Sequence, residues 1–535
     1  MGIELLPAAL DAAHLRRWVQ TAQDRLADRR GDLDSVNVFP VADSDTGTNL
    51  LLTLTEAAAA ASAAPPGSTT AEVAAALVRG ALVGARGSSG VIVAEYLRAL
   101  VGGVVPTDGG GSAVGPQQLA AALARASDAA YDAVGDPVEG TVLTVARAVA
   151  AAAEVGLEAS AGAGTQGAVG TPTTVEVLEA AVVQGYEALR RTTAQLPALA
   201  AAGVVDAGAW GLLLVLDALA HCLGGEGSLE RSRQVVRAQP APECGASTCV
   251  TTTQAHGAPP AVTGPEFEVM YLVSAAPGLD GTCPDLAATL RAALSLTGGS
   301  VAVVGGDGLW QVHVHTDDPL LALDAAPAGS VSQVRVRHLG SQAGVHGSHR
   351  PTLGLVAVTR APGLVPDLAR AGAVVVLGDP GPELDRAVED TGAAEVLVLS
   401  AATVGRPMRH GVVVAEDLSE VQVVCGAATT AASVHGGGSA TALLEHVLAA
   451  VRGVRTAVVP AVDGDVGGDR QAERVTGTAR ELLEDGMSLL TAVTSAATPP
   501  AAVEGLRATG ALPADVEVVV LAGAGHGADI VLGAE

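Results

Sequence analysis

The chain has 535 residues, enough for three or four domains of ordinary size, each with its own core. Hydrophobic residues make up 49% and charged residues 16%, a composition that is typical of folded proteins and excludes an intrinsically disordered chain. Acidic residues outnumber basic residues by 57 to 30, and the resulting net charge of −27 argues against unaided binding of nucleic acid.

All 30 basic residues are Arg, because the sequence contains no Lys. This excludes a Walker-A phosphate loop, the ATP-binding lysine of protein kinases and a Schiff base with pyridoxal phosphate. An anionic substrate would have to be bound by Arg, by backbone N–H groups at helix N-termini, or through metal ions.

The five Cys residues are scattered and form no Cys-x-x-Cys pair, and we find no signal-peptide pattern. The longest uncharged stretch, between Glu420 and Glu445, is rich in Gly, Ser and Thr, so it does not predict a transmembrane helix. We therefore expect a cytoplasmic protein without a transmembrane segment.

Residues 1–225 contain a series of Ala- and Leu-rich segments of helix length, separated by stretches rich in Gly, Ser and Thr. In the first segment, Leu15, Val19 and Leu26 recur at helical spacing and therefore share one face. The segments cover residues 8–30, 50–64, 71–85, 116–134, 141–155, 175–192 and 211–223. The pattern predicts an all-α domain over residues 1–225.

Residues 226–262 have the Pro, Ala and Thr content of a linker. Residues 263–350 are predicted to form a small α+β domain, with strands at 267–275, 300–306 and 309–316 and a helix at 283–296. Residues 351–535 alternate helices with Val-rich strands at 352–359, 373–379, 394–401 and 421–427. Buried strands that are linked by helices predict an α/β domain with a parallel sheet.

The segment NVFPVADSDTGTN, Asn37–Asn49, combines two carboxylates with the start of a predicted helix. Asp43 and Asp45 stand one residue apart in a loop, where they can converge on one point and offer the oxygen ligands that suit Mg²⁺. The residues that follow, Thr46–Asn49, supply hydroxyls, N–H groups and a helix dipole that favour phosphate. Spacing alone leaves two interpretations open, a metal–nucleotide site and an ordinary acidic turn capped by Thr.

This segment resembles the NVFPVPDGDTGTN signature of proteins like the kinase subunit of bacterial fatty acid kinase. Their N-terminal domain belongs to the DhaL family of nucleotide-binding dihydroxyacetone kinase subunits. Three further segments resemble motifs of the family in the same order: GARGSSGVI at 84–92, DPVEGTVLTVARA at 136–148 and LPALAAAGVVDAGAWGLL at 196–213. FEVMYLV and QVHVHTDDP resemble its middle domain. The resemblance implies a DhaL-like helical bundle with ATP at one end.

The resemblance also implies roles for individual residues. Asp43 and Asp45 match the carboxylates that hold two Mg²⁺ ions between the nucleotide phosphates, and Asn37 lies near the place of a third metal-binding Asp. The residues that match the nucleotide-contacting loops are Thr46, Thr48, Asn49, Ser88, Ser89, Thr141, Asp206 and Gly208.

The chain departs from the signature between the two aspartates, where Ser44 replaces a Gly. A Gly at this position can adopt a positive φ, whereas a residue with a side chain is strained in that conformation. Because the metal- and phosphate-binding residue types are present, we expect an active site.

The resemblance implies an ATP-dependent kinase that phosphorylates a fatty acid carboxylate, presented by a separate lipid-binding protein, to give an acyl phosphate. Two other functions stay open. One is a dihydroxyacetone-type kinase subunit, whose ketone substrate is presented by a partner subunit, and the other is a non-catalytic scaffold that binds nucleotide.

His313 and His315 alternate on a predicted strand and therefore project from one face. Two such side chains can chelate Zn²⁺ when a third ligand is present, and a structural pair is the alternative interpretation. The resemblance implies a metal near this strand, with a Cys as partner, in a middle domain that forms a homodimer. This chain has Glu268 in the place of that Cys.

Residues 351–535 loosely resemble the DegV-like domain of the family, which docks the lipid-binding partner. The chain has Gly378–Leu384 (GDPGPEL) and Ala401–Ala402 where the family carries a Gly-Gly-x-Thr-Met-Asn-Pro loop and an Asn pair. We therefore expect this domain to support docking and dimer formation and not to bind a polar ligand.

Overall fold

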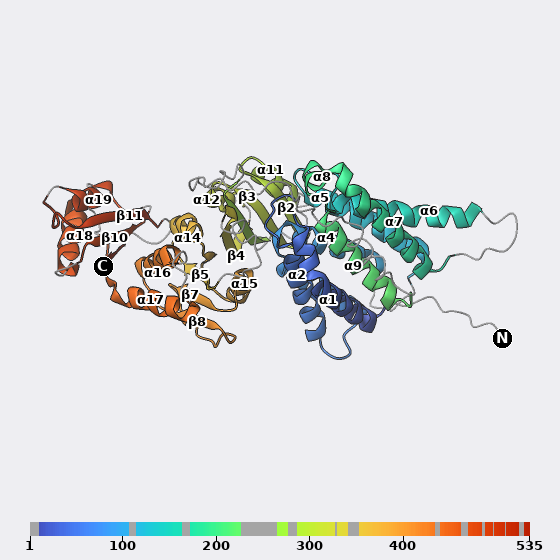
Figure 1. Ribbon diagram of the computed structural model, residues 1–535, viewed down its shortest axis with the longest axis horizontal. Helices are drawn as coiled ribbons and strands as arrows, with labels where there is room; N and C mark the ends of the chain where they lie inside the picture. Colours follow the sequence, from blue (N-terminus) through green and yellow to red (C-terminus); the bar gives the residue numbers. More distant parts are fainter. Residues whose placement is uncertain are drawn as a thin grey trace, which may run out of the picture. The chain divides into compact units, whose positions relative to one another are not determined.

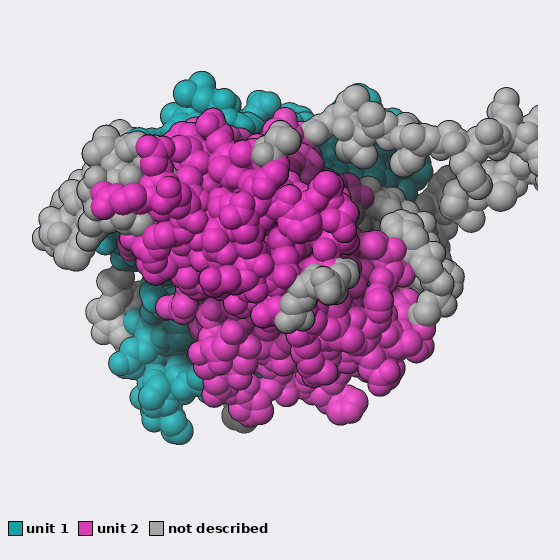
Figure 2. Space-filling model, turned by 90° about the vertical axis from the view of Figure 1, so that its left-hand side faces the viewer, with its two compact units in different colours: residues 1–263, 272–314 teal, residues 264–271, 315–535 magenta. Residues whose placement is uncertain are grey.

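The computed structural model describes residues 10–105, 114–162, 172–225, 265–275, 286–326, 329–340, 352–433, 439–461, 469–483, 487–495, 497–508, 510–523 and 529–535. The chain divides into two compact units (Figure 2), residues 1–263 with 272–314 and residues 264–271 with 315–535. The linker predicted at residues 226–262 lies outside the described residues.

The described part of residues 10–225 is helical (Figure 1), which confirms the predicted all-α domain. Its helices are α1 (Ala12–Ser35), α2 (Thr46–Ala63), α3 (Thr70–Val83), α4 (Gly87–Val104), α5 (Pro116–Ala133), α6 (Val142–Gly162), α7 (Thr174–Gln195), α8 (Pro197–Ala202) and α9 (Ala207–Cys222).

Local sequence signals set several of these helix ends. Thr69 forms a capping box with Glu72 at the start of α3, and Thr173 forms one with Glu176 at the start of α7. Helices α5 and α8 begin with Pro, which lacks the N–H that a first helical residue could not use. Gly203, with φ of +69°, ends α8 in the left-handed conformation that Gly adopts without strain.

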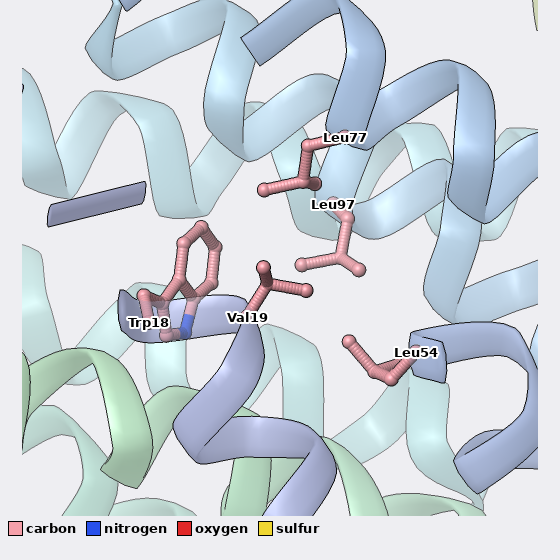
Figure 3. A pocket seen from close by; sticks show the side chains of 5 residues that line it. All are labelled: Trp18, Val19, Leu54, Leu77 and Leu97. Carbon is pink, nitrogen blue, oxygen red and sulfur yellow. The ribbon is translucent and has the colours of Figure 1, made fainter. Parts of the chain in front are cut away.

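The core of the helical domain joins α1 to the last helix, α9, although the two are far apart in sequence. The Trp18 indole donates to the Val215 carbonyl at 2.9 Å, and Arg25 forms a buried ion pair with Asp217. Figure 3 shows Trp18 beside apolar side chains from the first four helices, Val19, Leu54, Leu77 and Leu97, and the space that they enclose is apolar and small. These five side chains are buried and form part of the core of the bundle.

Part of the middle α+β region belongs to the first unit. It contains α11 (Leu286–Leu294), β2 (Gly298–Gly306) and most of β3 (Leu309–Thr316), which neighbours β2. The Gly305 N–H donates to Glu95 of α4 at 3.2 Å, and the Gly135 N–H donates to the Val301 carbonyl at 2.9 Å. Strand β2 is thereby hydrogen-bonded to the helical domain.

The second unit contains an α/β sheet in which β6, β5, β7 and β8 are parallel in that spatial order, as the Val-rich pattern predicted. Strand β4 pairs with β6 in the antiparallel direction. The elements are β1 (Phe267–Ala275, in part), α12 (Pro319–Asp324), β4 (Gly329–His338), β5 (Gly354–Thr359), η2 (Pro362–Leu364), α14 (Val365–Arg370), β6 (Val374–Leu377), α15 (Glu383–Asp390), β7 (Val396–Ser400), β8 (Val412–Ala415), α16 (Glu420–Ser433) and α17 (Ala440–Gly453).

A second, mixed sheet follows in the same unit, in the order β11-β10-β12-β9, and the sequence pattern did not predict it. Strands β10 and β11 are parallel, whereas β12 is antiparallel to both β10 and β9. Its elements are β9 (Arg455–Val459), α18 (Asp469–Leu482), β10 (Leu489–Thr494), α19 (Pro500–Arg507), β11 (Glu517–Ala522) and β12 (Ile530–Ala534).

The strand predicted at residues 421–427 is wrong, because these residues lie in α16. Ser419 and Gln422 cap one another at its start: the Gln422 side chain accepts from the Ser419 N–H at 3.0 Å, and the Ser419 hydroxyl accepts from the Gln422 N–H at 3.3 Å. This reciprocal cap outweighs the β propensity of the Val residues. The strand in this part of the chain is β8, Val412–Ala415, which comes before the helix.

Candidate functional site

Each of the four motifs in the helical domain becomes the N-terminus of a helix. The DTGTN segment opens α2 at Thr46, and GARGSSG opens α4 at Gly87. The EGTVLT segment opens α6 at Val142, and VVDAGAW opens α9 at Ala207. The motifs therefore share a local structure, a loop that turns into a helix.

These four helix N-termini meet at one place. The hydroxyls of Thr46 in α2 and Ser89 in α4 are 3.5 Å apart. A Cβ placed on Gly208 in α9 would lie 3.7 Å from the Ser89 hydroxyl and 3.5 Å from Cβ of Val142 in α6. Asp206, at the start of α9, accepts from the N–H of Ala209 at 2.7 Å, and the Val142 backbone also donates to it.

The convergence concentrates positive potential from backbone groups, and the buried Arg86 lies at the start of α4. The first N–H groups of a helix have no partner within the helix, and each N-terminus carries about half an elementary charge. Four such ends together offer about two elementary charges of fixed positive potential, which favours phosphate groups. The arrangement compensates for the absence of Lys from the sequence.

The two aspartates of the loop lie at the start of α2, and both are half-buried. The side-chain amide of the buried Asn37 donates to Asp43 Oδ1 at 2.6 Å, so these two residues lie together. Asp45 is the N-cap residue of α2, but its carboxylate makes no capping hydrogen bond. Carboxylate and amide oxygens are the ligand types that Mg²⁺ takes in proteins, so the donor set fits this ion.

Ser44, between the aspartates, has a φ of +54°. The backbone here adopts the left-handed conformation that a Gly would take without strain, as the departure from the signature predicted. The strain lies at the turn that presents Asp43 and Asp45, and strained backbone of this kind is concentrated at functional sites.

Asp34, near the end of α1, is a site residue that the sequence analysis did not identify. Its Oδ1 accepts from the Thr48 N–H and its Oδ2 from the Thr48 hydroxyl, both at 2.9 Å. Burial raises the pKa of Asp34, and the charge of Asp45 raises it too, while the hydrogen bonds from Thr48 lower it. The N–H and the hydroxyl of Thr48 are thus both directed to Asp34, and no spacing signal links residues 34 and 48.

The remaining predicted residues lie at the same helix starts. Ser88 is in the first turn of α4, and the Thr141 hydroxyl donates to the Val138 carbonyl at 2.7 Å in the loop before α6. Gly87 has a φ of +56°, and a Cβ on it would lie 2.4 Å from Nδ2 of Asn49. Asn49 therefore packs against the turn that opens α4, which only Gly permits at this distance.

Asp206 is buried and caps α9. Burial raises the pKa of its carboxyl to about 6, although the hydrogen bonds from Ala209 and Val142 act in the opposite direction. Its negative charge lies among the converging helix N-termini, where it ties the starts of α6 and α9 together.

In the middle region, the first His of the VHVHT segment, His313, is buried, and its Nδ1 lies 3.0 Å from the Ser300 carbonyl of β2. His315, two residues later, is also buried. A ring nitrogen of His315 lies within 4.8 Å of a carboxylate oxygen of Glu268, and both residues belong to the second unit. The Glu268 carboxylate, however, forms a buried ion pair with Arg337 of β4 through both Nε and Nη2. The side chain that stands in the place of the Cys is therefore engaged in an ion pair through Oε2.

In the second unit, the crevice at the carboxyl ends of parallel strands is the usual ligand position of such sheets. Here Glu420 of α16 accepts from the Thr359 hydroxyl at 2.6 Å and from the Arg360 N–H at 2.9 Å, directly after β5. Arg360 also pairs with Asp379 at 3.0 Å. The polar groups at this edge are bound to one another.

Two regions of the chain match known protein families. Residues 40–221 match the DAK2 domain, and residues 264–345 match the FakA-like middle domain, that of proteins like the kinase subunit of fatty acid kinase. The two matches, in this order, confirm the predicted resemblance to FakA-like proteins with a DhaL-type domain. A membrane-spanning helix is not found among the helices of the described residues.

Relatives include Protein YloV of Bacillus subtilis (strain 168), which is 30% identical over 336 residues, 62% of this chain and 56% of YloV. Protein SH1689 of Staphylococcus haemolyticus (strain JCSC1435) is 31% identical over 303 residues, 56% of this chain and 50% of that protein. The chain spans about half the length of these curated relatives. Among solved structures, the dihydroxyacetone kinase of C. freundii with AMP-PNP and Mg²⁺ is 20% identical, with a TM-score of 0.28, over 41% of this chain and 36% of that one.

The strain at Ser44 predicts that Ser44→Gly stabilises the protein. Relief of the left-handed φ outweighs the extra freedom of Gly in the unfolded chain, so the free energy of unfolding should rise by roughly 0.5–1 kcal/mol. Chemical denaturation measures this change. Ser44→Ala, which keeps the Cβ and removes the hydroxyl, is the control and should give no gain; a loss of stability in Ser44→Gly would contradict the prediction.

The raised pKa of Asp206 predicts a pH-dependent stability. The Asp206 carboxyl keeps its proton up to a higher pH in the folded protein than in the unfolded chain. Its buried charge therefore lowers the stability of the fold above about pH 6, and this cost disappears as the pH falls towards 4. Asp206→Asn is neutral throughout, so its stability relative to the unaltered protein should improve between pH 4 and pH 7 by on the order of 2 kcal/mol. Denaturation of the nucleotide-free proteins tests this, and a difference that does not change with pH would refute it.

The Glu268–Arg337 ion pair predicts that Glu268→Gln destabilises the protein, because the guanidinium stays buried without its counter-charge. The loss should be about 3–5 kcal/mol, and EDTA should leave the Tm of the unaltered protein unchanged. Calorimetry with metal analysis of the same sample distinguishes the two interpretations of this region. Stoichiometric zinc together with a lower Tm in EDTA would show that a metal, and not Arg337, holds these strands.

Proposed function

From a DAK2 domain over residues 40–221 followed by a FakA-like middle domain over residues 264–345, we propose that the chain is the nucleotide-binding subunit of a Mg-ATP-dependent phosphotransferase. Its acceptor is a fatty acid carboxylate that a separate lipid-binding protein presents, and the product is an acyl phosphate. The observation that carries the proposal is the convergence of four helix N-termini beside Asp43 and Asp45.

The nucleotide phosphates bind at the helix starts. The N-cap residues of α4 and α2, Arg86 and Asp45, make no capping hydrogen bond with their side chains. The Arg86 side chain therefore accepts no hydrogen bond from the first N–H groups of α4, which include those of Ser88 and Ser89. Thr46 and Gly208 contribute backbone from α2 and α9 on either side of Ser89.

Asp43 and Asp45, with Asn37 beside them, would hold two Mg²⁺ ions, which supply positive charge to the β- and γ-phosphates. The donors fit because the Asn37 amide lies against Asp43, and Asp45 follows two residues later at the start of α2. Phosphoryl transfer depends mainly on positioning and on neutralising charge, and the fixed helix dipoles contribute to both without reorganising.

A carboxylate acceptor suits a site of this kind. A fatty acid carboxylate is ionised at neutral pH, so it attacks without a general base, and no residue is needed to remove a proton. The difficulty is repulsion between two anions in a protein of net charge −27, and the helix N-termini oppose it.

The experiment described below can also support either of two other functions. A dihydroxyacetone-type kinase subunit would use the same nucleotide site with a ketone presented by a partner subunit. A scaffold would bind nucleotide and transfer nothing. The homodimer and the cytoplasmic location expected from the sequence remain proposals, and zinc binding by His313 and His315 is the alternative that the EDTA experiment tests.

Transfer from labelled ATP tests the acceptor. The purified protein is incubated with Mg²⁺ and either a lipid-loaded or a ketone-loaded partner, and we expect label in the acyl phosphate alone. Asp43→Ala should abolish this transfer while circular dichroism stays unchanged, because the carboxylate takes no part in the helical core. Label in the ketone would favour the second function, and bound nucleotide without transfer would favour the scaffold; undiminished activity of Asp43→Ala would remove Asp43 from the site.

A further inference from the structure

A buried hydroxyl of α2 is hydrogen-bonded to the start of α4. Thr53, about two turns after the start of α2, is fully buried, and its hydroxyl donates to the Asn49 carbonyl of its own helix at 2.7 Å. The same oxygen accepts from the backbone N–H of Arg86 at 3.1 Å. Because Arg86 is the N-cap residue of α4, a side chain of one helix is bound to the residue that starts the other.

Two Gly residues of α4 allow the helices to pack this closely. A Cβ on Gly90 would lie 2.4 Å from the Thr53 hydroxyl oxygen. A Cβ on Gly87 would lie 2.4 Å from Nδ2 of Asn49. Both positions therefore require Gly, and the first two turns of α2 are fixed against the first turn of α4.

The two helices carry different parts of the proposed site. The loop of Asp43 and Asp45 leads into α2, whereas Ser88 and Ser89 lie in the first turn of α4. The two starts come together where the hydroxyls of Thr46 and Ser89 are 3.5 Å apart. A phosphate group that is bound from both helices needs these starts at a fixed separation, because binding and transfer both depend on the position of the bound groups.

We propose that Thr53 is a positioning residue of the site, whose hydroxyl sets the separation between the start of α2 and the start of α4. Without this hydroxyl, the buried N–H of Arg86 loses this acceptor. A buried N–H is costly to leave unpaired, so the first residues of α4 would shift towards another acceptor. The N–H groups of Ser88 and Ser89 would move with them. The inference rests on the proposed function, because it concerns spacing within the same nucleotide site.

The test is binding of the non-hydrolysable nucleotide AMP-PNP, with saturating Mg²⁺, to the full chain, measured by isothermal titration calorimetry. Thr53→Val removes the hydroxyl and keeps the shape of the side chain, and it should weaken AMP-PNP binding about tenfold. Thr53→Ser keeps the hydroxyl and should restore the affinity of the unaltered protein.

A second Thr of α2 offers a matched control. The Thr55 hydroxyl also donates to the carbonyl four residues before it, that of Leu51, at 2.8 Å. It accepts, however, from the Gln23 side chain of α1 at 3.0 Å and not from α4. Thr55→Val should therefore leave the affinity for AMP-PNP unchanged.

Gly90→Ala tests the same contact from α4 and serves if Thr53→Val does not fold. The added Cβ would press on the Thr53 hydroxyl and move α4 away from α2, so AMP-PNP binding should weaken by about tenfold or more. Gly102→Ala lies in the same helix with open space around its Cβ, and it should bind AMP-PNP as the unaltered protein does.

The result separates a positioning role from a structural one. Weaker binding in Thr53→Val and Gly90→Ala, with the affinities of Thr53→Ser and Thr55→Val unchanged, supports the inference. A lower Tm in the first two variants, with an unchanged affinity for AMP-PNP in the folded protein, would overturn it and leave the proposed function intact. Failure of the unaltered protein to bind AMP-PNP in a Mg²⁺-dependent manner would overturn the proposed function itself.

Discussion

The site depends on the backbone dipoles of four helices that start at one place. The protein has no Lys and a net charge of −27, so the average field around it repels anions. Helix N-termini oppose that field locally, because their N–H groups are held in position by the rest of the helix. They carry no formal charge, and so their burial does not incur the cost of desolvating an ion.

Two acidic residues at the same place connect neighbouring helices. Asp206 ties α6 to α9 by accepting from Val142 and Ala209, and Asp34 ties α1 to α2 by accepting from Thr48. These carboxylates accept hydrogen bonds from N–H groups that would otherwise be available to water or to a ligand. At the start of α4, the N-cap residue Arg86 makes no capping hydrogen bond with its side chain.

Arginine also accounts for the buried ion pairs of the described residues. Arg25 pairs with Asp217 between α1 and α9, and Arg337 pairs with Glu268 between β4 and β1. A guanidinium offers several donors in a fixed plane and can satisfy a buried carboxylate more completely than an ammonium group. The Glu268 pair also changes the chemistry of the middle region, since a residue held by Arg337 stands where a metal-binding Cys was expected.

The sequence by itself determined the helical domain, since helical periodicity is local and survives in a single chain. The motifs of the candidate site came from their resemblance to those of DhaL-type proteins. The sequence also identified Ser44 as a residue at a position suited to Gly, which its φ of +54° confirmed. Only the tertiary structure decided the rest. The Val residues of 421–427 became helical because Ser419 and Gln422 cap α16, and the second sheet required pairing between distant strands. Asp34 lies at the site because Gly47 allows α1 and α2 to approach closely. Its hydrogen bond with Thr48 links residues that are fourteen positions apart, which no local pattern encodes.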